Sequence, residues 1–175
     1  YCEKLLKEWF DKFLEKHHLP PTFVGRPSDY LLYNKKKISI SYLTAFSRIN
    51  CLEKFINFKK IESVFEIGGG FGAFSHSILH FYHNIKKLFY LDLCPNIYIG
   101  TQYLKFFVKK SVYDYLSTRN IKKIKVKGNK REIFPICPWQ IKQVDSKIDL
   151  FVNFSSFNEM DEKMVYNYLS KLKNI

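Results

Sequence analysis

Glycine is scarce in this sequence, with seven among 175 residues, and four of the seven lie at positions 68, 69, 70 and 72. No low-complexity linker or internal repeat divides the remainder of the chain. With 46% hydrophobic and 18% aromatic residues, a chain of this length can bury a sizeable core. We therefore expect one globular unit.

Cysteine is also sparse, and its spacing excludes the usual structural roles. The four cysteines form no C-x-x-C pair and have no histidine beside them at the spacing of a zinc site. The sequence therefore predicts reduced, buried thiols and no metal site. The cysteines are Cys2, Cys51, Cys94 and Cys137.

Long hydrophobic runs are missing as well. No apolar stretch approaches the length that spans a bilayer, and the chain does not open with the charged, apolar and cleavage regions of a secretory signal. The sequence therefore predicts a cytoplasmic protein without a membrane span.

Acidic residues are few beside the basic ones: 16 Asp and Glu stand against 29 Lys and Arg, a net charge of +13. Such a charge suits a polyanionic partner such as RNA. The lysines, however, come in short groups spread along most of the chain, which is typical of a solvated surface. A nucleic-acid partner therefore stays open without being favoured, and the oligomeric state is left open.

Two helices are predicted before the glycines. Residues 2–17 place their large apolar side chains on one stripe, which indicates an amphipathic helix that covers a core. Residues 22–37 read as a loop or arm. Ser39 or Ser41 then caps a second helix that runs through about residue 58. Its expected inward residues are Tyr42, Leu43, Phe46, Ile49 and Phe55.

From residue 61 the pattern changes to alternating strands and helices, which is typical of a Rossmann-like α/β fold with a parallel sheet. We thus divide the chain into an N-terminal helical cap, residues 1–60, and a Rossmann-like core, residues 61–175, within one globular unit. The predicted strands are 63–67, 88–93, 121–128 and 147–154; the predicted helices are 73–83, 96–109 and 159–173; residues 131–144 read as irregular.

The glycines follow the first of these strands and open a helix, an arrangement that receives a ligand at the helix N-terminus. Gly68, Gly70 and Asp92 also fit a dinucleotide-binding fingerprint loosely. Glu66, at the end of the strand, argues against a dinucleotide, because its carboxylate would lie beside the pyrophosphate. A ligand with an ammonium group is favoured, and an NAD-linked oxidoreductase is a distant alternative.

The acid-x-Gly-x-Gly-x-Gly pattern resembles motif I of the class I S-adenosylmethionine-dependent methyltransferases. The resemblance implies S-adenosylmethionine as cofactor. It places the first acid at the amino end of the methionine part, the glycine loop against that part, and an acid after the second strand on the ribose hydroxyls. The residues in these positions are Glu66, Gly68, Gly69, Gly70, Gly72 and Asp92. Phe71, Tyr90 and Leu93 are near enough to form walls for the adenosine.

A narrower resemblance rests on four segments in order: "FEIGGGFG", "YLDLCPNIYIGTQYL", "FPICPWQ" and "KIDLFVNFSSFNEMDEKMVYNYL". They resemble sugar O-methyltransferases associated with bacterial surface polysaccharides, except that Cys94 is inserted before Pro95. The resemblance implies an enzyme that methylates a sugar hydroxyl in surface polysaccharide or nucleotide-sugar biosynthesis, with a sugar or glycan as acceptor.

The fourth strand is followed by "NFSS" and not by the Pro-Pro-aromatic pattern of base N-methyltransferases, which argues against methylation of a base amino group. An RNA methyltransferase and a non-catalytic methyltransferase-like binding module remain as alternatives.

Hydroxyl methylation needs a base. Glu159 is the first candidate for this base and Asp161 the second. Ser156-x-x-Glu159 also matches a capping box at the start of the last helix. The histidines lie opposite the apolar stripe of their helix, so we expect them to face solvent. These histidines are His76, His80 and His83.

A complete class I sheet has seven strands, whereas this chain is expected to end one helix after the fourth. We therefore expect a C-terminally incomplete sheet from a longer enzyme, and the 175 residues are not expected to be fully active alone.

Overall fold

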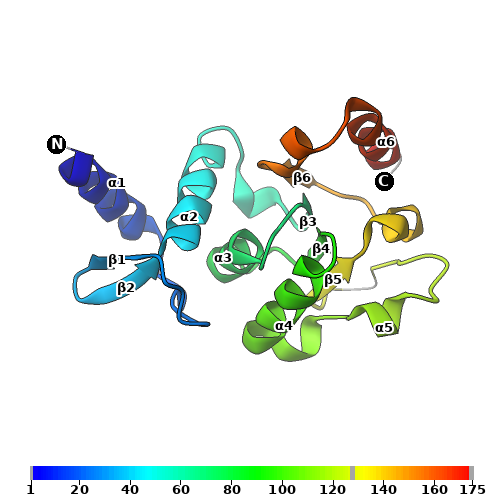
Figure 1. Ribbon diagram of the computed structural model, residues 1–175, viewed down its shortest axis with the longest axis horizontal. Coiled ribbons are helices and arrows are strands. Elements are labelled where there is room, and N and C mark those ends of the chain that lie inside the picture. Colours follow the sequence, from blue (N-terminus) through cyan, green and yellow to red (C-terminus); the bar gives the residue numbers. More distant parts are fainter. Residues whose placement is uncertain (1, 127–128, 174–175) are drawn as a thin grey trace.

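Four parallel strands occupy the centre of the protein, and helices lie on both faces of their sheet (Figure 1). The structure, a computed structural model, describes residues 2–126 and 129–173. Across the sheet the order is β5-β4-β3-β6, and every neighbouring pair is parallel. Because the order reverses beside the first strand, as in Rossmann-like sheets, the predicted α/β fold with a parallel sheet is confirmed. The strands are β3 (Ser63–Ile67), β4 (Lys87–Leu91), β5 (Glu132–Ile136) and β6 (Leu150–Asn153).

The α-helices are α1 (Cys2–Lys16), α2 (Ile40–Leu52), α3 (Ala73–Phe81), α4 (Asn96–Val108), α5 (Tyr115–Thr118) and α6 (Glu162–Leu172). The 3-10 helices are η1 (Phe58–Lys60), η2 (Lys109–Ser111), η3 (Pro138–Gln143) and η4 (Ser156–Glu159). Side chains of β3 alternate between two hydrophobic clusters: Val64 joins the one beneath α2, α3 and α4, whereas Phe65 and Ile67 join the one beneath η3 and α6. Glu66 therefore lies on the α2 and α3 side.

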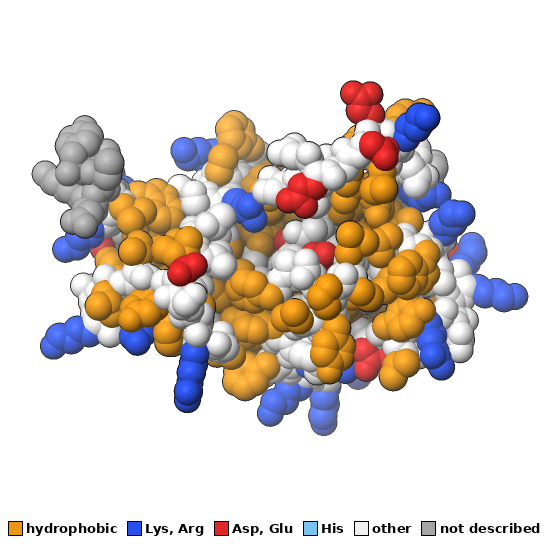
Figure 2. All heavy atoms as spheres, in the orientation of Figure 1, with side chains coloured by type: hydrophobic (Ala, Val, Ile, Leu, Met, Phe, Trp, Pro, Cys, Tyr) orange, Lys and Arg blue, Asp and Glu red, His pale blue; other side chains and the backbone are white. Residues whose placement is uncertain are grey.

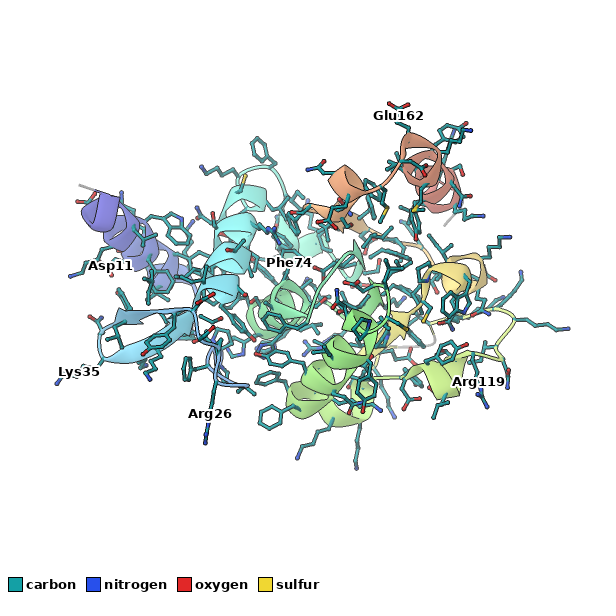
Figure 3. The ribbon with its side chains drawn as sticks, viewed as in Figure 1. Asp11, Arg26, Lys35, Phe74, Arg119 and Glu162 are labelled. Atoms are coloured by element: carbon teal, nitrogen blue, oxygen red, sulfur yellow. The ribbon has the colours of Figure 1, made fainter. Side chains whose placement is uncertain are left out.

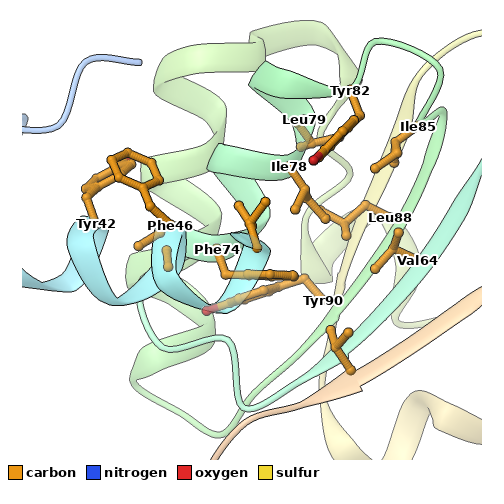
Figure 4. Close-up of a cluster of buried hydrophobic side chains, with 14 of the residues drawn as sticks. Tyr42, Phe46, Val64, Phe74, Ile78, Leu79, Tyr82, Ile85, Leu88 and Tyr90 are labelled. Atoms are coloured by element: carbon orange, nitrogen blue, oxygen red, sulfur yellow. The ribbon is translucent and has the colours of Figure 1, made fainter. Parts of the chain in front are cut away.

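The first cluster joins the N-terminal helices to the sheet. Tyr42 and Phe46 of α2 and Phe74 and Ile78 of α3 are buried together with Tyr90 of β4 (Figure 4). Burying one large apolar side chain contributes about 1.5–3 kcal/mol to folding. The position of α2 over the sheet is therefore held by the core.

The stripe on α1 covers the same cluster, as predicted. Phe10 and Phe13 are buried, and Trp9 and Leu14 are partly buried against it. The rings of Phe10 and Phe13 stack on Phe46 with centroid distances of 6.2 and 5.3 Å. Together with the hairpin described next, α1 forms one end of the molecule, opposite α6 (Figure 1).

A β-hairpin stands where the sequence predicted a loop or arm over residues 22–37. Its strands β1 (Tyr30–Tyr33) and β2 (Lys36–Ser39) pair antiparallel. Asn34 and Lys35 in the turn have φ 47 and φ 63, the two left-handed conformations that a tight hairpin turn requires. The prediction was wrong because most strand residues are exposed, so no apolar alternation marks them.

Helix α2 begins at the predicted cap but ends early. The hydroxyl of Ser39 accepts a hydrogen bond of 3.4 Å from the amide of Tyr42. The helix stops at Leu52 and not near residue 58, and Phe55, expected to point inward, is 82% exposed. Helical spacing does not apply to Phe55, because it lies in the turn after the helix.

The third strand of the sheet lies later than predicted. Residues 121–126 contribute one isolated bridge, from Ile124, and residues 127 and 128 lie outside the described residues. The strand is β5, within the stretch read as irregular. β5 contains Pro135, which an edge strand tolerates because one side of its backbone has no strand partner. The strand was not predicted because a proline within a segment argues against a strand.

His76 is buried, so the prediction that it faces solvent was wrong. Its side chain is 4% exposed, its ring stacks on Phe107 of α4 at 3.7 Å, and Nδ1 shares a hydrogen bond with the Tyr42 hydroxyl. Burial lowers the pKa of His76 to about 4. Helix α3 is covered by α2 and by α4, so its polar face is enclosed too; His80 is half-buried and His83 exposed.

The prediction of buried thiols holds for Cys137 but not for Cys51 and Cys94, which are exposed. The Cys2 side chain lies outside the described side chains. Cys51 lies in the last turn of α2, and Cys94 lies in the loop between β4 and α4. At such positions, spacing in the sequence does not indicate burial.

Basic side chains project from the rim of the molecule on the face seen in Figure 2, with apolar and uncharged groups between them. This agrees with the spread of lysines along the sequence. Within the described residues, no helix combines the length and the apolar character needed to cross a bilayer.

Candidate functional site

A pocket of about 330 Å³ lies at the carboxyl end of β3, beside the point where the strand order reverses. In doubly wound sheets this is the usual position of a ligand site. Ser41, Thr44 and Arg48 of α2 form one wall, and Glu66 with the loop of residues 68–71 forms another. The start of α3 completes the pocket with Phe74, which lies in the interior of the molecule (Figure 3).

The glycine loop has a backbone conformation that residues with a side chain rarely adopt. Gly68, Gly70 and Gly72 have φ 77, 61 and 96, which is the left-handed region. Gly72 is the residue before α3, and its carbonyl accepts the first bond of the helix from the amide of His76 at 2.8 Å. The chain therefore turns from β3 into α3 through left-handed conformations at three alternate positions, each occupied by glycine.

Tyr90 supports the loop from the sheet. Its hydroxyl donates a hydrogen bond to the carbonyl of Gly70. Cβ atoms added at Gly69 and at Gly100 would both lie closer than 3.0 Å to the Tyr90 side chain. Tyr90 is fully buried beneath the loop and does not line the pocket, whereas Leu93 is 59% exposed. The suggestion that these residues form walls for an adenosine stays a prediction.

Glu66 is a buried carboxylate that faces the pocket. Its side chain is 2% exposed and accepts a hydrogen bond from the hydroxyl of Ser75 on α3. The pKa of Glu66 is raised to about 7, chiefly by burial and to a smaller extent by the charge of Asp92, although the Ser75 hydrogen bond and the charge of Arg48 lower it. A buried acid with a pKa near neutrality is typical of a functional site.

Asp92, directly after β4, is tied to the glycine loop. Its Oδ2 accepts a hydrogen bond of 2.7 Å from the amide of Gly70, and its Oδ1 accepts one of 2.7 Å from the amide of Leu93. The side chain is 8% exposed and does not line the pocket itself. Each carboxylate oxygen keeps a second lone pair for a ligand donor. Glu66 and Asp92 thus both lie next to the loop, Glu66 near Gly69 and Asp92 at the amide of Gly70.

The end of β6 closes against the same loop. The side-chain amide of Asn153 donates a bond of 3.0 Å to the carbonyl of Ile67, and the Ser156 hydroxyl lies where a Cβ on Gly68 would have to go. The segment "NFSS", singled out in the sequence for its position after the fourth strand, is therefore in contact with the glycine turn.

Sequence reasoning missed Arg48. It lies on α2, half-buried, with Nη2 3.4 Å from the hydroxyl of Ser155 and its guanidinium carbon 4.5 Å from the ring centroid of Phe154. Nothing in the sequence marks it, because Arg48 and Glu66 are brought together only by the packing of α2 on α3.

The two proposed bases lie after β6 at the same edge of the sheet, outside the pocket lining. Asp161 caps α6, since its Oδ1 accepts a 2.9 Å bond from the amide of Met164. The predicted capping box of Ser156 and Glu159 was wrong, because the helix starts later, at Glu162. Glu159 is exposed and forms no hydrogen bond or ion pair with other described residues, so its assignment as base stays a prediction.

The donor set fits an organic zwitterion better than a metal. A carboxylate, a guanidinium and two hydroxyls line one pocket, and no group of three His, Cys, Asp or Glu side chains able to hold a metal occurs among the described residues. Searches against protein-family models, curated proteins and solved structures found no match to this chain.

Proposed function

We propose that this chain belongs to an S-adenosylmethionine-dependent methyltransferase of the class I type that methylates a sugar hydroxyl in the cytoplasm. The observation that carries the proposal is Glu66: a buried carboxylate, facing a pocket, directly before a glycine loop that opens a helix. A buried acid in that position attracts a ligand with an ammonium group and repels one with a pyrophosphate.

The proposal gives each site group a task. Glu66 binds the ammonium of the methionine part, the loop from Gly68 to Gly72 allows close approach of the ligand to the backbone, and Asp92 accepts from the ribose hydroxyls. When bound, the cofactor supplies a methyl group made electrophilic by its sulfonium.

The choice of a sugar hydroxyl as acceptor is supported by the motif order described in the sequence. An alcohol must lose its proton as it attacks the methyl group, so a base must lie near the acceptor oxygen. Among the described residues the Glu159 carboxylate forms no hydrogen bond or ion pair, whereas the carboxylate of Asp161 is engaged in the helix cap. Glu159 is thus preferred over Asp161 as base.

Calorimetric titration tests the cofactor assignment. The native chain should bind S-adenosylmethionine and S-adenosylhomocysteine but not NAD, and Asp92→Ala should abolish or greatly weaken that binding. Asp145→Ala is the matched control, because it removes a carboxylate from an exposed position outside the pocket and keeps both side-chain bonds to Gly70 in place. Binding of NAD alone would overturn the proposal.

RNA is the second candidate acceptor, favoured by the net charge of +13. RNA binding should weaken steeply as salt concentration rises, because each neutralised phosphate releases counterions. Transfer of a labelled methyl group to RNA and not to sugars would favour an RNA methyltransferase. Binding of the cofactor without transfer to any acceptor would indicate a non-catalytic module.

A further inference from the structure

The pocket beside the glycine loop carries opposite charges on opposing walls. Glu66 lies at the end of β3, and Arg48 lies on α2, where it faces the same 330 Å³ space. The two side chains are close enough for the charge of Arg48 to lower the pKa of Glu66. They form no ion pair, so a ligand can enter between them.

The guanidinium of Arg48 has hydrogen-bond donors that no described residue accepts from. In the described part of the chain no Asp or Glu lies within ion-pair distance of its guanidinium. Among the described residues its side chain forms one hydrogen bond, to Ser155, which is long at 3.4 Å, and its guanidinium lies over the Phe154 ring. A half-buried guanidinium with this few partners can form the paired bonds that suit a carboxylate.

The neighbouring side chains of α2 are polar on the same face. Thr44 precedes Arg48 by four residues and Ser41 precedes Thr44 by three, so all three point from one side of the helix into the pocket. The helix that the sequence predicted as a cap over the core therefore also supplies one complete wall of the candidate site.

We propose that Arg48 binds the α-carboxylate of the cofactor while Glu66 binds its α-ammonium, so that the pocket recognises the amino-acid zwitterion at the end of S-adenosylmethionine. This inference rests on the proposed function. It assigns α2, which lies outside the Rossmann-like core, to cofactor binding, and it makes Arg48 a specificity-determining residue.

Decarboxylated S-adenosylmethionine separates the two charges, because it keeps the ammonium and the sulfonium and lacks only the carboxylate. We expect native protein to bind S-adenosylmethionine on the order of ten- to a hundredfold more tightly than the decarboxylated compound, as for one charge-assisted hydrogen-bonded pair. In Arg48→Met the two affinities should differ by less than about threefold. Methionine preserves the apolar stem over Phe154.

Two further variants control the experiment. Arg119→Met removes the same charge from an exposed position outside the pocket and should keep the preference. Arg48→Lys keeps the charge without the planar fork and should show an intermediate preference. Equal binding of both compounds by native protein, or an undiminished preference in Arg48→Met, would overturn the inference and leave the proposed function standing. Failure of native protein to bind S-adenosylmethionine and S-adenosylhomocysteine would instead overturn the proposed function.

Discussion

The amide of Gly70 donates a hydrogen bond of 2.7 Å to Oδ2 of Asp92. The carbonyl of the same glycine accepts from the hydroxyl of Tyr90, so both backbone polar groups of Gly70 are bound by the end of β4. The loop after the first core strand is therefore held in place by the second. A substitution of Tyr90 or Asp92 should therefore alter the conformation of the loop that lines the pocket, although neither residue lines the pocket itself.

Gly100→Ala should destabilise the protein by about 1–3 kcal/mol, although alanine normally stabilises a helix relative to glycine. The added methyl group would lie closer than 3.0 Å to the Tyr90 hydroxyl, which is fixed by its bond to Gly70. Urea unfolding measures the change. Gln102→Ala, an exposed change on the same helix, should stay within about 0.5 kcal/mol. A stabilised Gly100→Ala would show that the contact is relieved at no cost.

Glu66→Gln should stabilise the unliganded protein at pH 8 by roughly 3 kcal/mol and leave it nearly unchanged at pH 4. The folded pKa of about 7 lies above the unfolded value of 4.5, so the folded state holds more protons between these values. Native stability therefore falls as pH rises from 4.5 to 7, and the glutamine variant escapes this loss. Chemical unfolding across this range gives the difference; an equal effect of the substitution at both pH values would contradict the assignment.

Affinity for S-adenosylmethionine should rise with pH through about 7, because only the ionised form of Glu66 attracts the ammonium. Ser75→Ala removes the hydrogen bond that lowers the pKa of Glu66, so the midpoint of the profile should move to higher pH. Ser77→Ala is the control, since Ser77 is buried on the same helix and bonds only the carbonyl of Ala73. Titration calorimetry at several pH values reports both midpoints. A midpoint unmoved by Ser75→Ala would exclude Glu66 as the titrating group.

His76 contributes a pH dependence of opposite sign. Its folded pKa of about 4 lies below the ordinary 6.5, so the stability that comes from keeping it neutral is complete above pH 6.5 and is lost as pH falls toward 4. His76→Asn retains an acceptor for Tyr42 but cannot titrate, and it should remove roughly 3 kcal/mol of this loss. The loss is measured as the difference between the free energies of unfolding at pH 7.5 and pH 4.5. His83→Asn, at an exposed histidine, is the control. If both variants follow the native profile, His76 is not the group responsible.

Local patterns predicted most of the core of the fold. The strand over residues 63–67, the glycine turn, the helix after it and the next strand and helix lie within a few residues of their predicted positions. Each is set by interactions between near neighbours in the chain: apolar spacing, a glycine conformation or a cap. The predicted cofactor residues Glu66 and Asp92 belong to this part, and the structure brings both to the glycine loop.

Predictions failed where burial depends on distant segments. His76 lies on the polar face of its helix, yet Tyr42 and Phe107 cover that face from helices on either side. Pro135 argued against a strand, yet an edge position tolerates it. In both places the local pattern was interpreted correctly, and the deciding partner lay elsewhere in the chain.

The sequence by itself determined the first two strands and helices of the core, the glycine turn and the two acids beside it, because short-range sterics and apolar periodicity specify these. Only the tertiary structure decided that Arg48 faces Glu66 across a pocket, that Tyr90 lies under the loop and that His76 is buried. These relations arise from packing between α2, α3, α4 and the sheet, and no spacing along one segment reveals which faces will be covered.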